Sequence, residues 1–116
     1  MDERLQKALD FSNYALTINN QKRNIKNRVA QLQLVHLSNG VFIANHETIS
    51  FLKSLIDLGH EKQVVILDSK ENPIKISSLA ELLEKLISAY FNAMNEYDSE
   101  YAKLRKVRSV KQIMDW

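Results

Sequence analysis

The sequence predicts an α+β fold with a stalk of two long antiparallel, coiled-coil-like helices. A small antiparallel β-sheet of two hairpins, with a short buried helix, forms a head at one end. Three observations predict this arrangement: heptad-spaced apolar residues near both ends of the chain, two β-rich runs with turn residues between them, and only one Pro and two Gly. Because Pro and Gly interrupt helices, their scarcity favours long ones.

The first long helix is expected over residues 1–34. Phe11, Ile18, Ile25 and Leu32 lie seven residues apart, which places them on one helical seam. The closing helix is expected over residues 78–108, where Ser78 can cap the first turn. Its apolar residues follow steps of three and four: Leu79, Leu83, Leu86, Tyr90, Met94, Tyr97, Tyr101 and Leu104.

The head is expected over residues 35–77. Asn39 and Gly40 between β-branched runs predict a hairpin with a type I′ turn. A helix over residues 45–58 follows, capped by Asn45 and ended by Gly59, with apolar residues on two sides that predict burial on both. Residues 63–77 predict a second hairpin, in which the continuous apolar run at residues 64–67 suits a strand covered on both faces.

The chain is expected to form one domain, with residues 109–116 as a C-terminal tail. The first long helix enters the head with its C-terminus and the last leaves it with its N-terminus, so the pair is antiparallel if it packs together. Opposite charges suit a register with Leu32 beside Leu79 and Phe11 beside Tyr101. That register also sets the acidic start, Asp2 and Glu3, beside Arg105 and Arg108.

Composition narrows the function classes. The net charge of +2 is too small to predict nucleic-acid binding by itself, and the absence of Cys excludes disulfides and thiolate chemistry. No apolar run approaches the roughly twenty residues of a membrane span, so no membrane association is expected. We expect a cytoplasmic protein, in host cytoplasm or a virion if the gene belongs to a phage.

Motifs for catalysis or cofactor binding are missing. His36, His46 and His60 match no metal-ligand spacing, and His46-Glu47 is not followed by the second histidine of a zincin motif. We therefore expect no catalytic residue, no metal ligand and no cofactor, and a non-enzymatic protein. The alternative is an enzyme whose residues meet only in space.

Self-association through the stalk is the leading hypothesis, with a dimer in a four-helix arrangement favoured. Tyrosines at seam positions carry hydroxyl groups that need a partner or water, so the seam is expected to be partly open or completed by a second subunit. The terminal Trp116 is expected to act in docking. The predicted interaction residues are Phe11, Ile18, Ile25, Tyr90, Met94, Tyr97, Tyr101 and Trp116.

Two basic clusters support an alternative, an accessory nucleic-acid-binding protein that contacts phosphates through helix faces. The clusters are Lys22, Arg23, Lys26 and Arg28 on the first helix, and Lys103, Arg105, Lys106, Arg108 and Lys111 at the end of the last. The possible phosphate contacts among them are Lys22, Arg23, Lys26, Arg105, Lys106 and Arg108. Solvated helix faces paired with acidic residues explain the same pattern and are favoured. The predicted register sets the clusters toward opposite ends of the stalk, which weakens the idea of a single basic patch.

The middle of the chain resembles a family of small proteins. The segments NGVFIANHETISFLKSL and VVILDSKENPIKI, followed by a long helix rich in Tyr and Ala, are similar to tail-fibre and tail-assembly proteins of contractile-tailed bacteriophages. The resemblance covers roughly residues 39–104 and rests on the order of an NG-F strand, a short helix, a D-x-x-x-N-P turn and a closing helix. It implies a non-enzymatic component of the virion or of its assembly, with other such proteins as partners, and brings no catalytic residues.

Overall fold

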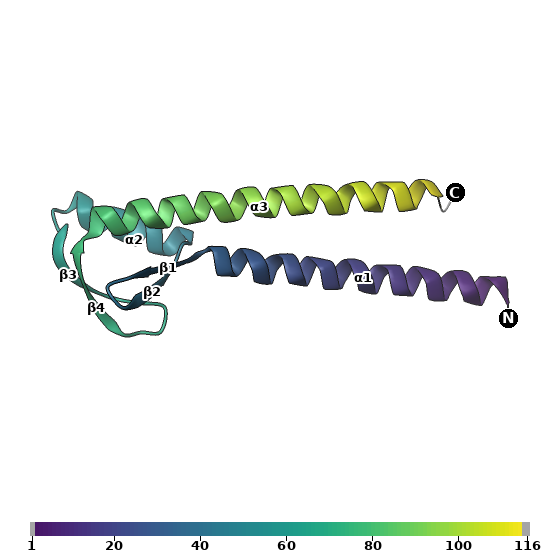
Figure 1. Cartoon of the computed structure of the whole chain (residues 1–116), viewed down its shortest axis with the longest axis horizontal. Helices are drawn as coiled ribbons and strands as arrows, with labels where there is room; N and C mark the ends of the chain where they lie inside the picture. The colour runs from purple at the N-terminus through teal and green to yellow at the C-terminus, as the bar shows by residue number, and fades with distance from the viewer. Residues whose placement is uncertain (1, 115–116) are drawn as a thin grey trace.

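The molecule is a rod with a small head at one end (Figure 1). The structure is a computed structural model that describes the backbone of residues 2–114 and the side chains of residues 2–106. Its extents are 69 × 23 × 18 Å and its radius of gyration is 21.1 Å, whereas a compact domain of this length would have about 13 Å. The elements, in order, are α1 (Glu3–Leu32), β1 (Leu34–Leu37), β2 (Gly40–Ile43), α2 (His46–Asp57), β3 (Lys62–Leu67), β4 (Pro73–Ser78) and α3 (Leu79–Met114). The predicted α+β class and the two long antiparallel helices are confirmed.

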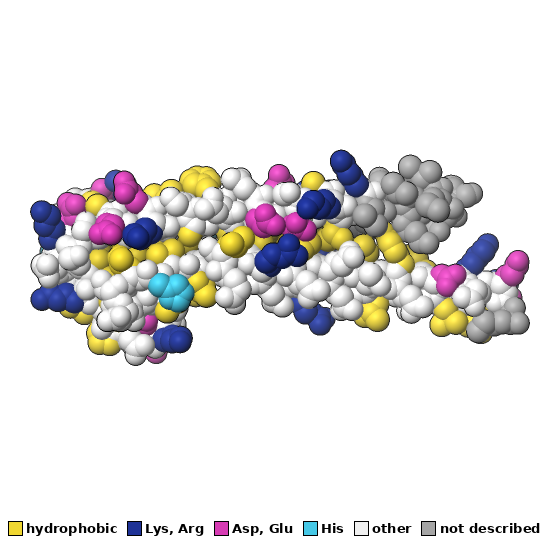
Figure 2. Space-filling view, viewed as in Figure 1, with side chains coloured by type: hydrophobic (Ala, Val, Ile, Leu, Met, Phe, Trp, Pro, Cys, Tyr) yellow, Lys and Arg dark blue, Asp and Glu magenta, His cyan; other side chains and the backbone are white. Residues whose placement is uncertain are grey.

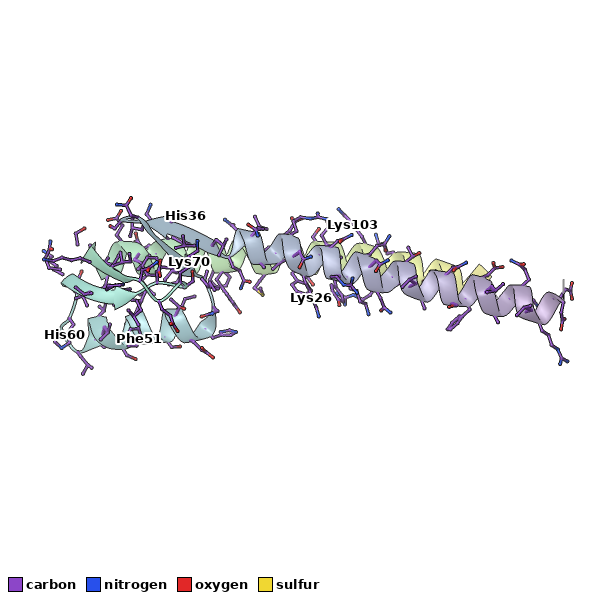
Figure 3. The ribbon with its side chains drawn as sticks, turned by 90° about the horizontal axis from the view of Figure 1, so that it is seen from below. Lys26, His36, Phe51, His60, Lys70 and Lys103 are labelled. Carbon is purple, nitrogen blue, oxygen red and sulfur yellow. The ribbon has the colours of Figure 1, made fainter. Side chains whose placement is uncertain are left out.

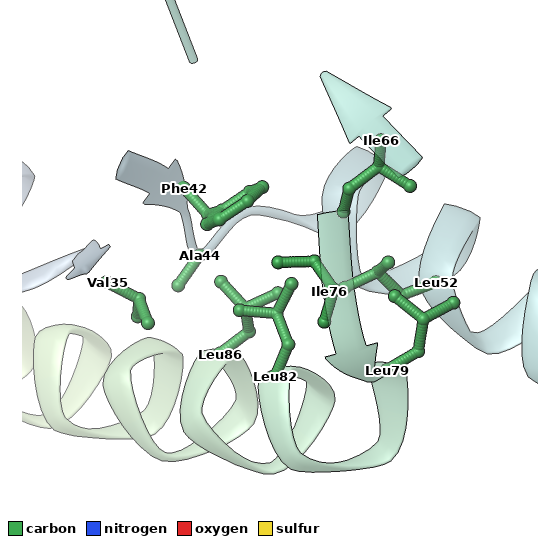
Figure 4. Packing of buried hydrophobic residues seen from close by; sticks show 9 residues of the cluster. All are labelled: Val35, Phe42, Ala44, Leu52, Ile66, Ile76, Leu79, Leu82 and Leu86. Carbon is green, nitrogen blue, oxygen red and sulfur yellow. The ribbon is translucent and has the colours of Figure 1, made fainter. Parts of the chain in front are cut away.

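The hydrophobic core of the head is built on the first turns of α3. Leu79, Leu82 and Leu86 are fully buried there, and both hairpins and α2 contribute side chains from above them (Figure 4). Because this spacing of three and four residues keeps the leucines on one face, a single helix face organises the head. The core cluster consists of Val35, Phe42, Ala44, Leu52, Ile66, Ile76, Leu79, Leu82 and Leu86.

The first hairpin turns one residue earlier than predicted. Leu37 pairs with Gly40, so the two turn residues are Ser38 and Asn39, both with positive φ, at 52° and 68°. Gly40 is needed for a different reason than the turn: a Cβ there would lie 2.8 Å from Ile74 Cγ1 and 3.0 Å from the Phe42 ring. The absence of a side chain at residue 40 therefore lets the second hairpin pack closely against the first.

The two hairpins form two separate two-stranded sheets, so the prediction of a single small sheet is wrong. Hydrogen bonds of the loop after β3 join them instead. The carboxylate of Asp68 accepts from the backbone N–H groups of Val41 (3.2 Å), Lys70 (3.0 Å) and Asn72 (2.9 Å), and Ser69 N–H donates to Val41 O at 2.8 Å. These donors, with Asn72 contributing most, hold the pKa of Asp68 below its ordinary value of 3.8.

The short helix α2 is covered on one side only. Its predicted cap is confirmed, since Asn45 Oδ1 accepts from Thr48 N–H at 2.9 Å, and Gly59 follows in the left-handed region with φ of 91°. Leu52 is fully buried, but Phe51 and Leu58 are exposed, so the predicted burial on two sides is wrong. The same holds for β3, where Ile66 is buried and its neighbours face solvent, because a two-stranded sheet packs one face on this core.

The stalk seam forms between the second half of α1 and the middle of α3. Its apolar cluster consists of Ile18, Ile25, Val29, Ala93 and Leu104, with Tyr14, Met94, Tyr97 and Tyr101 packed around it. Arg28 lies 3.7 Å from Glu96 and 3.6 Å from Glu100, and these contacts fix the position of α1 along α3.

The predicted register of the stalk is wrong by about eleven residues, or three helical turns. Leu79 is buried in the head, whereas Leu32, predicted to lie beside it, is 41% exposed. The physical reason is that the head hairpins already cover the first turns of α3, so α1 can meet α3 only further along. Gln33 holds α1 at this joint, since its backbone O accepts from Ala44 N–H at 2.7 Å and its Nε2 donates to Ala44 O at 3.0 Å.

Candidate interaction surface

The two sides of the stalk seam differ in chemistry. One side, which we name the polar flank, carries the charged side chains of Arg28, Glu100 and Lys103. The space-filling view shows charged side chains gathered over the middle of the stalk (Figure 2). Glu100 accepts from Lys103 Nζ at 3.2 Å and lies near Arg28, and both cations hold its pKa below the ordinary value of 4.5, Lys103 more strongly. A groove of about 300 Å³ runs beside these residues, between Asn24 on α1 and Lys103 on α3.

The other side, which we name the aromatic flank, consists of Phe91, Met94, Tyr97 and Tyr101 on α3. At about 100° per residue, Met94, Tyr97 and Tyr101 lie within about 60° of one another on α3, and Phe91 lies about 60° further round the helix, next to Met94. The rings of Tyr97 and Tyr101 have centroids 5.1 Å apart, and burial together with a hydrogen bond to Tyr101 raises the pKa of Tyr97 above its ordinary value of 10.0. A shallow groove of about 380 Å³ lies over Met94 and the two tyrosines.

Lys22 on α1 closes one edge of the aromatic flank. Its Nζ lies 5.9 Å from the centroid of the Tyr101 ring, within the range of a cation–π contact. On the other side of Tyr101, Arg105 Nε donates to the Tyr101 backbone O at 3.4 Å and Arg105 also lies 3.7 Å from Asp98. The flank is therefore apolar at its centre and charged at its rim, as protein interfaces are.

The predicted interaction residues fall into different environments. Ile18 and Ile25 are buried in the seam of their own chain, and Met94, Tyr97 and Tyr101 are half-buried beside it. Phe11 is 70% exposed and does not lie beside Tyr101, a position that Lys22 takes. Trp116 lies outside the described residues.

Tyr90 belongs to the head rather than to the seam. Its hydroxyl lies 3.3 Å from His46 Nε2, and its ring meets the rings of His46 and Phe91 edge-on. It packs against the head core, which leaves the exposed Phe91 beside it as the aromatic group at this end of the flank.

The structure brings the two basic clusters to the same part of the stalk, so their predicted separation is wrong. Lys22 and Arg105 both contact Tyr101, and Lys26 and Lys103 lie near the same level on opposite sides of the two helices (Figure 3). Arg23, Lys26 and Lys106 are exposed, and the side chain of Arg108 is not among those described. The change of register, and not any new charge, explains the difference.

Four exposed apolar residues are not among the predicted interaction residues. Phe91 belongs to the aromatic series with Tyr90, Tyr97 and Tyr101 in the sequence, but it lies one position after the seam residue Tyr90 and outside the heptad. Leu5, Leu9 and Leu16 are exposed on α1 at steps of four and seven, on a different face from the heptad of Phe11 and Ile18. The regular heptad marks only the apolar stripe that contains Phe11 and Ile18, whereas α1 carries a second stripe of leucines.

No group of three or more His, Cys, Asp or Glu side chains among residues 2–106 could hold a metal ion. His36 and His60 lie on different parts of the head, well apart in Figure 3, and His46 interacts with Tyr90. Within the described part of the chain, no helix is both long enough and apolar enough to cross a membrane. Comparisons with protein-family models, with curated proteins and with solved structures found no match for this chain.

Proposed function

We propose that the chain is a non-enzymatic structural or assembly protein that self-associates through the aromatic flank of its stalk. The observation that supports this most is Phe91, a large aromatic side chain that is 58% exposed on the outer edge of the flank, next to Met94. One exposed and two half-buried aromatic side chains, rimmed by charges, are the composition expected of an interface centre.

A dimer suits this surface best. A straight flank on a rod is complementary to the same flank on a second rod, and twofold pairing uses one patch twice. The four helices of two stalks would then share a common core of Phe91, Met94 and the two tyrosines. In this arrangement we expect coiled-coil-like packing of α1 against α3, with side chains of the second copy filling the shallow groove over Tyr97.

The proposed setting is the cytoplasm or a particle assembled there. The resemblance of residues 39–104 to phage tail-fibre and tail-assembly proteins supports a role in virion assembly, with other assembly proteins as further partners. An elongated stalk with a separate head suits such a role because one part can associate while the other part remains available for contacts.

The test compares two single substitutions of equally exposed phenylalanines. Phe91→Ser removes the aromatic anchor of the flank, whereas Phe51→Ser alters a residue on α2 with 55% exposure, far from the stalk. Light scattering coupled to size exclusion should show a smaller mass for Phe91→Ser and the parental mass for Phe51→Ser. A parental mass for both, or a monomeric parental protein at every concentration, contradicts self-association through this flank.

The second candidate function is nucleic-acid binding by the basic side chains around Tyr101. The observation that favours it is the shared position of Lys22 and Arg105, which the register brings together. Replacing Arg105, Lys106 and Arg108 by Gln should abolish DNA retention and leave the molecular mass unchanged. If the parental protein does not bind DNA at low salt, where phosphate contacts are strongest, this candidate is excluded.

A further inference from the structure

The N-terminal half of α1 has no packing partner within the described residues. Every side chain from residue 2 to residue 13 is exposed, and the seam contacts begin only at Tyr14 and Ile18. In Figure 1 the two long helices diverge toward their free ends, and α1 continues beyond the end of α3. An isolated helical segment of this length is marginal in water, so something is expected to cover it.

One face of this segment carries three exposed leucines: Leu5, Leu9 and Leu16. At about 100° per residue, they lie on the side of α1 opposite Ile18 and Ile25, so they point away from the stalk seam. We name them the leucine face. Asp2 and Arg23 lie seven residues before Leu9 and seven after Leu16, so the face has an acid at one end and a base at the other.

We propose that the leucine face pairs antiparallel with the leucine face of a second copy of this chain. In that arrangement Leu5 of each copy lies against Leu16 of the other, and Asp2 comes within one helical turn of Arg23 of the second copy. A parallel pair would set Asp2 against Asp2 and Arg23 against Arg23, so like charges would meet at both ends.

Both end charges are available for such pairing. Arg23 is exposed and takes part in none of the ion pairs among the described residues. Asp2 caps α1 through Oδ1, which accepts from Arg4 N–H at 3.1 Å, and the residue is exposed. The remaining heptad positions of this face carry uncharged side chains, with Ser12 between Leu9 and Leu16 and Asn19 between Leu16 and Arg23, so no charge at these positions opposes the approach.

This inference rests on the proposed function, because the leucine contact is small and we expect it to join proteins that are already dimers. Two stalks held side by side present two leucine faces, and simultaneous engagement of both faces strengthens a contact that is weak alone. The parental protein should therefore form an assembly larger than a dimer at high concentration, and its mass should fall to that of a dimer on dilution.

The first test uses disulfide cross-linking, which has no background because the chain lacks Cys. Ser12→Cys places a thiol near the twofold axis of the antiparallel pair and should cross-link two chains. Asn19→Cys should not, since the two thiols would lie about 25 Å apart along the helices. Cross-linking of both variants would indicate a parallel pair, and cross-linking of neither would show that this face is not an interface; either result overturns the proposal.

The second test separates this interface from the aromatic flank by mass. The double substitution of Leu9 and Leu16 by Ser should leave a dimer at all concentrations, whereas Leu58→Ser, an exposed leucine at the end of α2, should leave the parental mass. An unchanged mass for the double variant overturns the leucine contact alone. If that variant becomes a monomer while Phe91→Ser keeps the parental mass, the leucine face is the sole interface, and the proposed role of the aromatic flank fails instead.

Discussion

Lys22 lies over the ring of Tyr101, with Nζ 5.9 Å from the ring centroid. This contact defines how the stalk is assembled, because the sequence-based register set Phe11 at that place. The difference moves α1 about eleven residues, or three helical turns, along α3. As a result the first turns of α3 serve the head, the middle of α3 pairs with α1, and the N-terminal half of α1 is left exposed.

Substitutions at neighbouring positions of α2 should differ sharply in their effect on stability. Leu52→Ala should lower the free energy of unfolding by about 2–5 kcal/mol, because Leu52 is fully buried in the core of the head. Phe51→Ala should change it by less than about 1 kcal/mol, because Phe51 faces solvent. Urea unfolding followed by circular dichroism measures both, and equal losses would contradict the one-sided burial of α2.

The two glycines should respond differently to Ala. Gly40→Ala should cost about 1–3 kcal/mol, because the new Cβ would clash with Ile74 Cγ1 at 2.8 Å and push the hairpins apart. At Gly59, where φ is 91° and no atom lies within 4 Å of an added Cβ, only the left-handed conformation opposes Ala, at a cost of about 1 kcal/mol. Chemical denaturation measures the free energy of unfolding of both variants. A larger loss for Gly59→Ala than for Gly40→Ala would contradict the prediction.

Asp68 should make the head sensitive to acid. Its pKa is lowered in the folded protein, so its ionised form contributes stability that is complete above its ordinary value of 3.8 and is lost as pH falls through the folded value. Asp68→Asn keeps the size of the side chain but removes the charge, and should lower the melting temperature by several degrees at pH 7. The difference from the parental protein should shrink at pH 2 to 3; a constant difference would argue against this role of the carboxylate.

Exchanging the charges of the Arg28 ion pair with Glu100 should test the register of α1 along α3. Arg28→Glu places a third acid beside Glu96 and Glu100 and should lower the melting temperature by a few degrees. Combining it with Glu100→Arg should restore much of the loss, and high salt should reduce both effects. Failure of the second substitution to restore stability at low salt would place Arg28 elsewhere along α3.

Local signals predicted the elements well. The caps at Asn45 and Gly59 and the loop of the second hairpin are short-range features, and their bonds form within a few residues of the chain. The first hairpin was predicted as well, although its turn lies one residue earlier. The separation of the hairpins into two sheets could not be predicted, because it depends on the carboxylate of Asp68 reaching Val41, which lies far away in the sequence.

The register of the stalk could not be predicted from the sequence for a different reason. Phe11, Ile18, Ile25 and Leu32 repeat every seven residues, but sliding the helix by about eleven residues, or three helical turns, again brings apolar residues of α1, including Val29, to the seam. Only the space that the head takes on α3 separates the two solutions. The same ambiguity affects the candidate site. The heptad predicted its tyrosines, but it did not predict the exposure of Phe91 or of the leucine face, which depends on where α1 lies along α3.

Both proposals depend on this register, and one distance comparison tests it most directly. Spin labels attached to cysteines at residues 24 and 103, which line the same groove, should lie close together, whereas labels at residues 10 and 103 should be farther apart. The two positions on α1 are fourteen residues apart, or about 21 Å along the same side of the helix. Pulsed electron resonance on magnetically diluted samples, in which only distances within one chain are counted, should give the shorter distance for the pair 24 and 103. A shorter distance for the pair 10 and 103 would restore the sequence-based register and contradict the pairing of Arg28 with Glu96 and Glu100.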